Sequence, residues 1–316
     1  MLRFTAQRLT HAVMVILVVT LVTHIGLFYF GDPFKTTPDE KMLPPETQQM
    51  LRERFGTDKP FLARYLIYLK NLFTGEFGVD FEQRRPVGEL IAHVAPHTAG
   101  LAVLAILISL TVGVLAGALA AVRPGTALDA VITTTTITLL CLPVFVVALV
   151  FRQELSGLRL FGVELFPALP HAFGVDVPWL REVLLPAITL ALVDIAFVAR
   201  MMRASMLDVL AADYLRTARA KGLSERRVVL RHGMRNAIIP VVNHAGLAIG
   251  ALMGGAVIVE TIFQYDGVGF LFIKSLHDAN RPVVIAIALL GAIAFVLLIA
   301  LVDLISAYLD PRIRVT

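Results

Sequence analysis

Long apolar runs, separated by shorter polar segments, account for most of the chain. Six of them are each long enough to cross a hydrocarbon core of about 30 Å as a helix. They are residues 9–30, 97–122, 128–151, 183–199, 237–262 and 283–306. The pattern predicts an all-α polytopic membrane protein with six transmembrane helices. Because the number of helices is even, both termini are expected on the same side of the membrane.

The composition agrees with this pattern. Hydrophobic residues make up 57% and charged residues 16% of the chain, whereas soluble domains contain about 45–50% and about 25%. An ordinary soluble domain is therefore excluded. The single cysteine, Cys141, lies within an apolar run, which excludes an intrachain disulfide and a cysteine-based metal site.

The distribution of basic residues predicts the orientation. If both termini are cytoplasmic, the cytoplasmic side carries 14 Lys or Arg residues against five Asp or Glu residues. Nine of these basic residues lie between Arg200 and Arg235. Since loops on the cytoplasmic side carry an excess of Lys and Arg, we expect cytoplasmic termini and a cytoplasmic loop at about residues 200–236.

The segment between the first two runs is of mixed, water-soluble composition. Residues 46–55 and 59–74 alternate apolar and charged positions at helical spacing, and Gly56, Gly75 and Gly78 interrupt them. The sequence therefore predicts a helical extracytoplasmic insertion between the first two transmembrane helices. The expected division is an N-terminal transmembrane helix (1–30), an extracytoplasmic helical segment (31–95) and a five-helix core (96–316).

Residues 213–240 form a basic, amphipathic interruption in the apolar sequence. A helix is expected to end at Lys221, because Gly222 suits the left-handed position that follows a helix. Ser224 is a good N-cap for a second helix, and Glu225 favours the positive N-terminus of that helix. The segment is thus predicted to be a helix, a sharp turn and a helix.

The chain contains no glycine-rich phosphate-binding loop ending in Lys and Ser or Thr, so any energy from ATP must come from another polypeptide. We interpret the basic segment as a contact for such a motor, with small residues at Thr217, Ala218 and Gly222 fitting a protein groove. The alternative is a basic loop attracted to anionic lipid headgroups. The candidate contact residues are Asp213, Tyr214, Arg216, Thr217, Ala218, Arg219, Ala220, Lys221, Gly222, Leu223, Ser224 and Arg226.

Polar residues inside the membrane commonly mark a translocation pathway, because each is costly to hold in lipid. Asp194, Asn243 and His244 are of this kind, and with Glu260 and Phe263 they are the candidate pathway residues. No pair of them is evident as a proton relay. The alternative for Asp194 is an ion pair with Arg200 or a contact with a neighbouring helix.

Glycines recur every four residues at Gly246, Gly250 and Gly254, which predicts a smooth ridge for the close approach of another helix. This helix could belong to the same subunit or to a partner. Gly113 and Gly117 have the same spacing in the second run, and there we expect packing within the subunit.

Pro143, Pro186 and Pro240 lie inside or at the start of apolar runs, where the missing backbone donor bends or ends a helix. They are either hinges or residues that fix packing angles.

Four histidines, His93, His97, His171 and His277, lie near the expected membrane edges. No carboxylate or cysteine accompanies them at the spacing of metal ligands. We therefore expect interfacial hydrogen bonds from these side chains in preference to metal binding.

One family carries the same motifs. Arg216-Thr217-Ala218-Arg219-Ala220-Lys221-Gly222, with Arg231-His232 and Asn236-Ala237-Ile238-Ile239-Pro240, resembles the cytoplasmic loop of binding-protein-dependent ABC importer permeases. The closer resemblance is to the first permease of the dipeptide/oligopeptide branch. Further matches are Gly31-Asp32-Pro33, residues 54–60 with Tyr65, residues 75–78, Pro96-His97-Thr98, and residues 260–263 followed by Gly267-Val268-Gly269. Asp266 stands where the family usually has proline.

The resemblance implies a non-enzymatic permease subunit of the MetI-like fold in the bacterial plasma (inner) membrane. It implies a paralogous second permease, two ATP-binding subunits or one fused ATPase, and an extracytoplasmic peptide-binding protein as partners. No nucleic acid and no cofactor of this chain is expected, since ATP and Mg²⁺ belong to the partner subunits. Residues 31–95 would either dock the binding protein or shield the outer gate.

Peptide is the expected substrate, and the same branch also imports nickel, glutathione and haem. A more distant alternative is an ATP-independent channel or a proton-coupled carrier, and a further one is an assembly scaffold whose basic loop only binds lipid.

Overall fold

The chain is helical almost throughout the part that the computed structural model describes, which is residues 2–29, 49, 53, 58–80, 85–160, 163–167, 178–278 and 280–309. Turns and short loops connect the helices, and the β-structure of the described residues consists of an isolated bridge, Val79 with Pro86, and one antiparallel hairpin of β1 (Arg159–Leu160) and β2 (Val163–Glu164). The predicted all-α fold is confirmed. Most of the helix predicted at 46–55 lies outside the described residues.

Two compact units make up the chain, and each is described by itself. The first unit contains Met1–His97 and Asp266–Thr316, and the second contains Thr98–Tyr265. Both units therefore share the long helix α4 (Val87–Val122). The division at residues 30 and 95 expected from the sequence stays a prediction.

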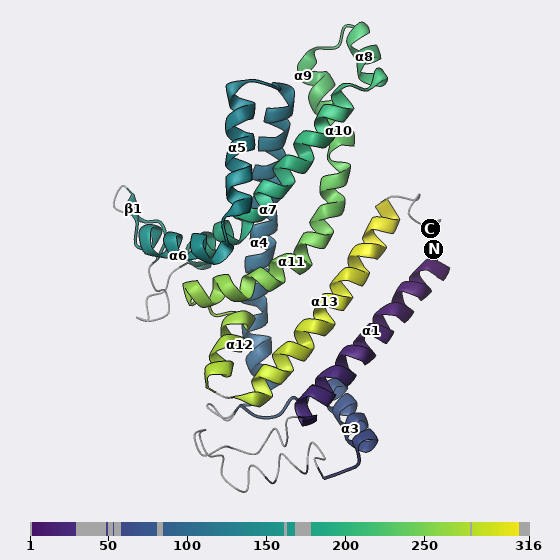
Figure 1. The fold of residues 1–316 in the computed structure, drawn as a ribbon, viewed down its shortest axis with the longest axis vertical. Helices are drawn as coiled ribbons and strands as arrows, with labels where there is room; N and C mark the ends of the chain where they lie inside the picture. Colours follow the sequence, from purple (N-terminus) through teal and green to yellow (C-terminus); the bar gives the residue numbers. More distant parts are fainter. Residues whose placement is uncertain are drawn as a thin grey trace. The chain divides into compact units, whose positions relative to one another are not determined.

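The first unit is formed by α1 (Leu2–Tyr29), α3 (Phe61–Thr74), the start of α4, α12 (Val268–His277) and α13 (Arg281–Leu309) (Figure 1). Helices α1 and α13 pack side by side. A hydroxyl–hydroxyl bond of 3.0 Å between Thr20 and Tyr65 holds α3 against α1. The apolar core of this unit includes Val87 of α4 and Val283 of α13, both completely buried.

The second unit is organised around α7 (Trp179–Leu210), which packs against several neighbouring elements of this unit (Figure 1). In the most apolar window of α7, 61% of the residues are buried, compared with 28% for α4. The other elements are α5 (Ala127–Cys141), α6 (Val144–Leu155), α8 (Asp213–Ala220), α9 (Glu225–Arg227), the π-helical turn η1 (Val228–Gly233), α10 (Met234–Ala237) and α11 (Ile239–Phe263).

Glycines allow α4 to approach α7 closely, as predicted for Gly113 and Gly117. A methyl group on Gly113 would lie 2.7 Å from a side-chain carbon of Val198, and one on Gly117 would overlap the carbonyl oxygen of Ala199. The absence of a side chain at both positions is therefore a packing requirement of the second unit.

Long apolar helices match the predicted spans. Among the described residues, three helices are long and apolar enough to cross a membrane: Val87–Val122, Trp179–Leu210 and Arg281–Val302. Two bent helix pairs raise the number to five if each is counted as one span, and Thr10–Gly26 is a shorter apolar helix within α1. The described residues thus hold three to five candidate spans, and the predicted number of six stays a prediction.

The prediction of one helix over residues 128–151 is wrong. Helices α5 and α6 replace it and are bent by 102° relative to each other. The break lies at Leu142, which adopts an extended conformation, and at Pro143, which precedes α6. Proline lacks a backbone donor and forces the preceding residue out of the helical region, which explains the bend. Pro186 lies within α7, and Pro240 lies at the start of α11.

Candidate functional site

A cavity of about 540 Å³ opens in the second unit between α7, α11 and the bend joining α5 to α6. Its volume lies in the range of about 300–1,000 Å³ that is usual for small-molecule sites. Its lining is apolar except for two side chains. The lining residues are Leu140, Leu142, Val144, Leu190, Val193, Asp194, Phe197, His244, Ala248, Leu252 and Gly255.

The two polar lining residues, Asp194 and His244, are bonded to each other. The carboxylate oxygen Oδ1 of Asp194 lies 2.8 Å from Nε2 of His244, and Oδ2 accepts a 2.5 Å hydrogen bond from the hydroxyl of Ser109. The ring of Phe197 stacks on that of His244 with centroids 4.5 Å apart. This network joins α4, α7 and α11 at the cavity wall.

The sequence interpretation found no pair evident as a proton relay among the intramembrane polar residues, and the structure brings two of these residues, Asp194 and His244, into contact. Asp194 pairs with neighbouring helices, as one alternative proposed, and its partners in the described part of the chain are His244 and Ser109. Fifty residues separate Asp194 from His244, so only tertiary packing brings them together. The signal in the sequence was that each is a lone titratable residue within an apolar run.

The other candidate pathway residues do not belong to this cavity wall as it is formed by the described residues. Asn243 is half-buried next to His244, and Glu260 is completely buried near the end of α11. Phe263 is packed in the apolar core. Their assignment to a pathway stays a prediction, and the geometry supports Asp194 and His244 more strongly.

One glycine of the predicted ridge on α11, Gly254, faces open space in the described part of the chain. A methyl group on Gly254 would meet no atom within 4 Å, and Gly246 and Gly250 are half-buried. The adjacent Gly255, in contrast, would meet a side-chain carbon of Leu190 at 3.1 Å. Packing of α11 against α7 thus uses Gly255, and of the predicted ridge Gly254 is open to another helix.

The predicted helix, turn and helix is present at the tip of the second unit (Figure 1). Helix α8 ends at Ala220, one residue before the predicted end, and Gly222 has a φ of 77°. Ser224 precedes α9, but its side chain makes no capping hydrogen bond; its carbonyl oxygen accepts from the N–H of Arg227 at 2.8 Å. Glycine is needed at 222 because other residues disfavour this conformation.

Apolar contacts anchor α8 to the rest of the unit. Leu215 is completely buried and Ala218 nearly so, and both pack with Val228, which follows α9. Val209 and Leu210, at the end of α7, complete this cluster. Ala218 was predicted to lie on the exposed docking face; instead it faces inwards, because it packs with Leu215 and with Val228 beyond the turn.

A double ion pair closes the turn between α8 and α9. Nε and Nη2 of Arg219 donate to the carboxylate of Glu225 at 3.1 and 2.9 Å. The hydrogen bonds from Arg219 lower the pKa of Glu225, and those to Glu225 raise the pKa of Arg219. A second link joins the start of α8 to α10, where the amide of Asn236 donates to the hydroxyl of Tyr214 at 2.9 Å.

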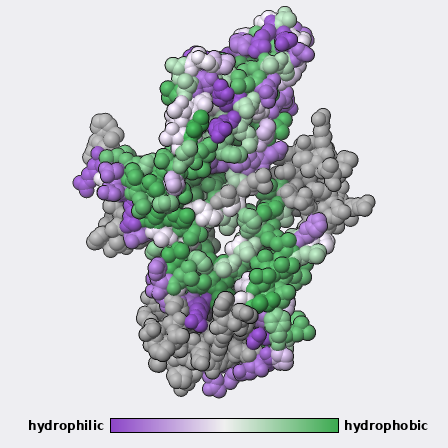
Figure 2. Space-filling model, in the orientation of Figure 1, coloured by the Kyte–Doolittle hydropathy of each residue, from purple (hydrophilic) through white to green (hydrophobic). Residues whose placement is uncertain are grey.

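The remaining candidate contact residues are available at the surface. Figure 2 shows hydrophilic residues gathered over α8 and α9 and a hydrophobic surface over α6 and α11. Leu223 is half-buried in the turn. The exposed candidates are Asp213, Tyr214, Arg216, Thr217, Arg219, Ala220, Lys221, Gly222, Ser224 and Arg226. The outer face of α8 is thus a charged, small-residue surface carried on a buried apolar base.

Comparisons with known proteins identify relatives over the whole chain. A family model described as "Binding-protein-dependent transport system inner membrane component" matches residues 113–315, and a model for the N-terminal part of such components matches residues 1–102. The oligopeptide transport system permease protein AppB of Bacillus subtilis (strain 168) is 36% identical over 286 residues, which is 90% of each chain.

Two further relatives come from Escherichia coli (strain K12). The dipeptide transport system permease protein DppB is 34% identical over 340 residues, and the glutathione transport system permease protein GsiC is 34% identical over 318 residues. Both alignments cover 99% of each chain.

A solved structure, titled as a crystal structure of an amino acid ABC transporter with histidines, shares the fold. Its TM-score is 0.50 and its sequence identity 18%, with 70% of this chain and 94% of that chain covered. The predicted resemblance is confirmed, and the relatives confirm a transport subunit instead of an enzyme. The chain belongs to the family of binding-protein-dependent transport system inner membrane components.

Proposed function

We propose that this chain is one of two permease subunits of an ATP-driven importer of di- or oligopeptides. The observation that carries the proposal is that one helix, α7, connects the two parts of the candidate site. Asp194 in the cavity wall and Leu210 under α8 both belong to α7. At a rise of about 1.5 Å per residue they are about 24 Å apart along the helix.

Movement of α8 would be transmitted to the cavity through this helix. The buried contacts of Leu215 with Val209 and Leu210 leave α8 little freedom to move independently of α7. An ATPase that displaces the exposed face of α8 would therefore also displace the segment of α7 that carries Asp194. Such a displacement is a rigid-body change of the kind used for alternating access.

The proposed partners follow from the family and from the absence of a phosphate-binding loop in the sequence. They are a paralogous permease, two ATP-binding subunits that hold ATP and Mg²⁺, and an extracytoplasmic peptide-binding protein. The open ridge at Gly254 supports a contact with a helix of the second permease. We place the chain in the bacterial inner membrane with cytoplasmic termini, so that α8 faces the ATPases.

Peptide is proposed as the substrate because relatives of similar identity are named for oligopeptide and dipeptide transport. A relative named for glutathione transport is equally similar, which supports small peptides in general. Calorimetric titration of the partner binding protein with dipeptides, longer peptides, glutathione, Ni²⁺ and haem separates these substrates. Tight binding of Ni²⁺ or haem without peptide binding would overturn the peptide assignment.

A proton-coupled carrier is the second candidate, and the Asp194–His244 pair is the observation that favours it. Co-purification discriminates between the two. An importer subunit is expected to be recovered with two ATP-binding subunits and a second permease when all are co-expressed. Recovery of the chain alone, with pH-gradient-driven uptake in its purified form, would favour the carrier.

A further inference from the structure

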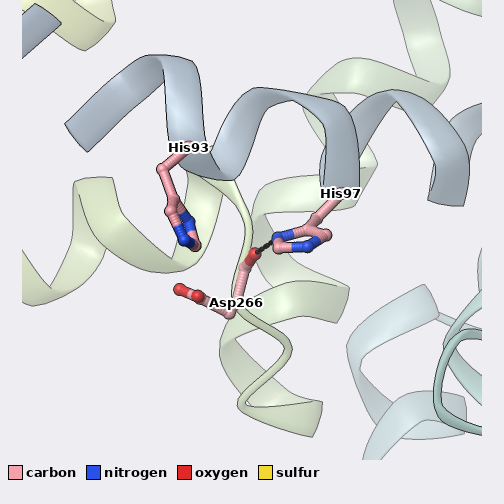
Figure 3. A group of neighbouring side chains, drawn as sticks. All are labelled: His93, His97 and Asp266. Atoms are coloured by element: carbon pink, nitrogen blue, oxygen red, sulfur yellow. Dashed lines mark hydrogen bonds between the residues drawn. The ribbon is translucent and has the colours of Figure 1, made fainter. Parts of the chain in front are cut away.

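Two histidines and an aspartate converge in the first unit. His93 and His97 lie one turn apart on the same face of α4, and Figure 3 shows both rings directed towards Asp266, which lies between α11 and α12. The ligand atoms of the three side chains lie within 4.8 Å of one another. His93 is exposed, and His97 and Asp266 are half-buried. The sequence interpretation missed this group because Asp266 follows His97 by 169 residues.

A hydrogen bond orients the second histidine in this group. Nδ1 of His97 lies 2.8 Å from the backbone carbonyl oxygen of Asp266 (Figure 3). A carbonyl oxygen only accepts, so this nitrogen carries the proton and His97 is held beside the aspartate. The expected interfacial hydrogen bond is therefore present. The backbone contact also fixes the Asp266 side chain within reach of His93, whose ring centroid is 6.0 Å from that of His97.

We propose that His93, His97 and Asp266 bind one divalent transition-metal ion of the zinc class. Imidazole nitrogens favour Zn²⁺, Ni²⁺ and Cu²⁺ over Mg²⁺ and Ca²⁺, and two histidines with one carboxylate form an established type of zinc ligand set. The ion would bind one ring nitrogen of each histidine, and the proton of each neutral ring would then sit on its other nitrogen. Binding through Nδ1 of His97 would take the place of the hydrogen bond to the carbonyl oxygen of Asp266. Water or a residue of a docked partner completes the coordination.

The distances between the three side chains permit metal coordination after small side-chain movements. Ligand atoms about 2.0–2.1 Å from a tetrahedral ion lie about 3.3 Å from one another, so the observed group must contract by about 1.5 Å. His93 is exposed, so its side chain is free to rotate towards the other two ligands. The ring of His97 already lies close to Asp266, with Nδ1 2.8 Å from the backbone carbonyl oxygen.

The position of the group gives the ion a structural role. The chain passes from the first unit to the second after His97 and returns before Asp266. An ion held by both residues would tie the two connecting segments to each other. In the proposed topology these residues lie on the extracytoplasmic side, where the ion would be taken up from the medium. The binding test itself does not depend on that topology or on transport.

The test uses the full-length protein in detergent, prepared without a histidine tag and treated with a chelator. ZnCl₂ is titrated by calorimetry into the wild-type protein and into the variants His93→Gln and Asp266→Asn, with MgCl₂ and CaCl₂ as further titrants. His277→Gln is the matched control, because His277 is also exposed and belongs to the same unit but lies outside the group. CoCl₂ provides a visible absorption spectrum that reports on the coordination.

We expect the wild-type protein and His277→Gln to bind one Zn²⁺ with the same affinity and to bind neither Mg²⁺ nor Ca²⁺. Each ligand variant should lose at least about tenfold in affinity, since even changes outside the direct ligands cost about 10–100-fold. The Co²⁺ spectrum should disappear in His93→Gln. A wild-type protein that binds no Zn²⁺, or ligand variants that bind it like the wild type, would overturn the proposal. Because His93 is exposed, its replacement is not expected to prevent folding.

Discussion

Replacing Gly222 or Gly125 should strain the backbone equally, but only Gly222 lies at the proposed contact between α8 and an ATPase. Comparing the two replacements therefore distinguishes loss of that contact from backbone strain. Gly222 has a φ of 77° and Gly125 a φ of 74°, and a methyl group at either position would meet no atom within 4 Å. A leucine at either position therefore costs about the same, roughly 1–2 kcal/mol for a left-handed conformation. The first side-chain carbon at either position meets no described atom, so the two replacements begin in equally open space.

The two replacements should nevertheless differ in function. Gly222 lies in the turn after α8, which we propose to insert into an ATPase groove, whereas Gly125 lies between α4 and α5 on the same proposed side of the membrane. The assay measures peptide uptake and peptide-stimulated ATP hydrolysis by the reconstituted complex. Gly222→Leu should reduce both at least tenfold, and Gly125→Leu should leave both within about twofold of the wild type.

Thermal unfolding of each purified variant supplies the control. Equal, small decreases in the unfolding midpoint are expected for both, because the strain is the same. Normal uptake by Gly222→Leu, or an equal loss of uptake in Gly125→Leu, would refute the role of this turn as a partner contact.

Four further substitutions test the internal architecture. Gly117→Leu should destabilise the protein by about 1–3 kcal/mol or more in thermal unfolding, whereas Gly254→Leu should leave the isolated chain stable and weaken its co-purification with a second permease; equal effects would contradict the two assignments. Arg203→Lys should lower the unfolding midpoint, because lysine cannot reproduce the paired 2.7 and 2.8 Å bonds to Asp129, and an unchanged midpoint would show that this contact is dispensable. Asp194→Asn should reduce uptake with ATPase assembly intact, and unchanged uptake would remove Asp194 from the pathway.

Local features of the sequence predicted the turn after α8 well. Gly222 is followed by a helix start at Ser224 and Glu225, and these short-range preferences determine a backbone conformation without help from distant residues. The orientation of Ala218 was not predictable in the same way. Its inward position depends on contacts with Val228, which lies beyond the turn.

Contacts between residues far apart in the sequence were the main features that the sequence did not predict. The sequence identified Asp194 and His244 as unusual, but their contact requires α7 and α11 to pack at one particular register. The same holds for Asp266, whose departure from the family pattern was visible while its proximity to His97 was not. Apolar runs indicate where candidate spans lie, but they do not give the relative depth of two helices.

The bend at Pro143 was predicted only in part from the sequence. Pro143 marked a site where a helix bends or ends, yet the sequence did not distinguish a mild kink from the observed bend of 102° between α5 and α6. The extent of a bend depends on what the second helix packs against, and α6 packs on α7 and α11.

The most direct test of the account is uptake of a labelled dipeptide by proteoliposomes. The vesicles contain this chain, its second permease and two ATP-binding subunits, with the peptide-binding protein outside and ATP with Mg²⁺ inside. We predict uptake that requires internal ATP and every subunit, and that is lost in Gly222→Leu. Uptake by vesicles that contain this chain alone, without ATP, would contradict the account.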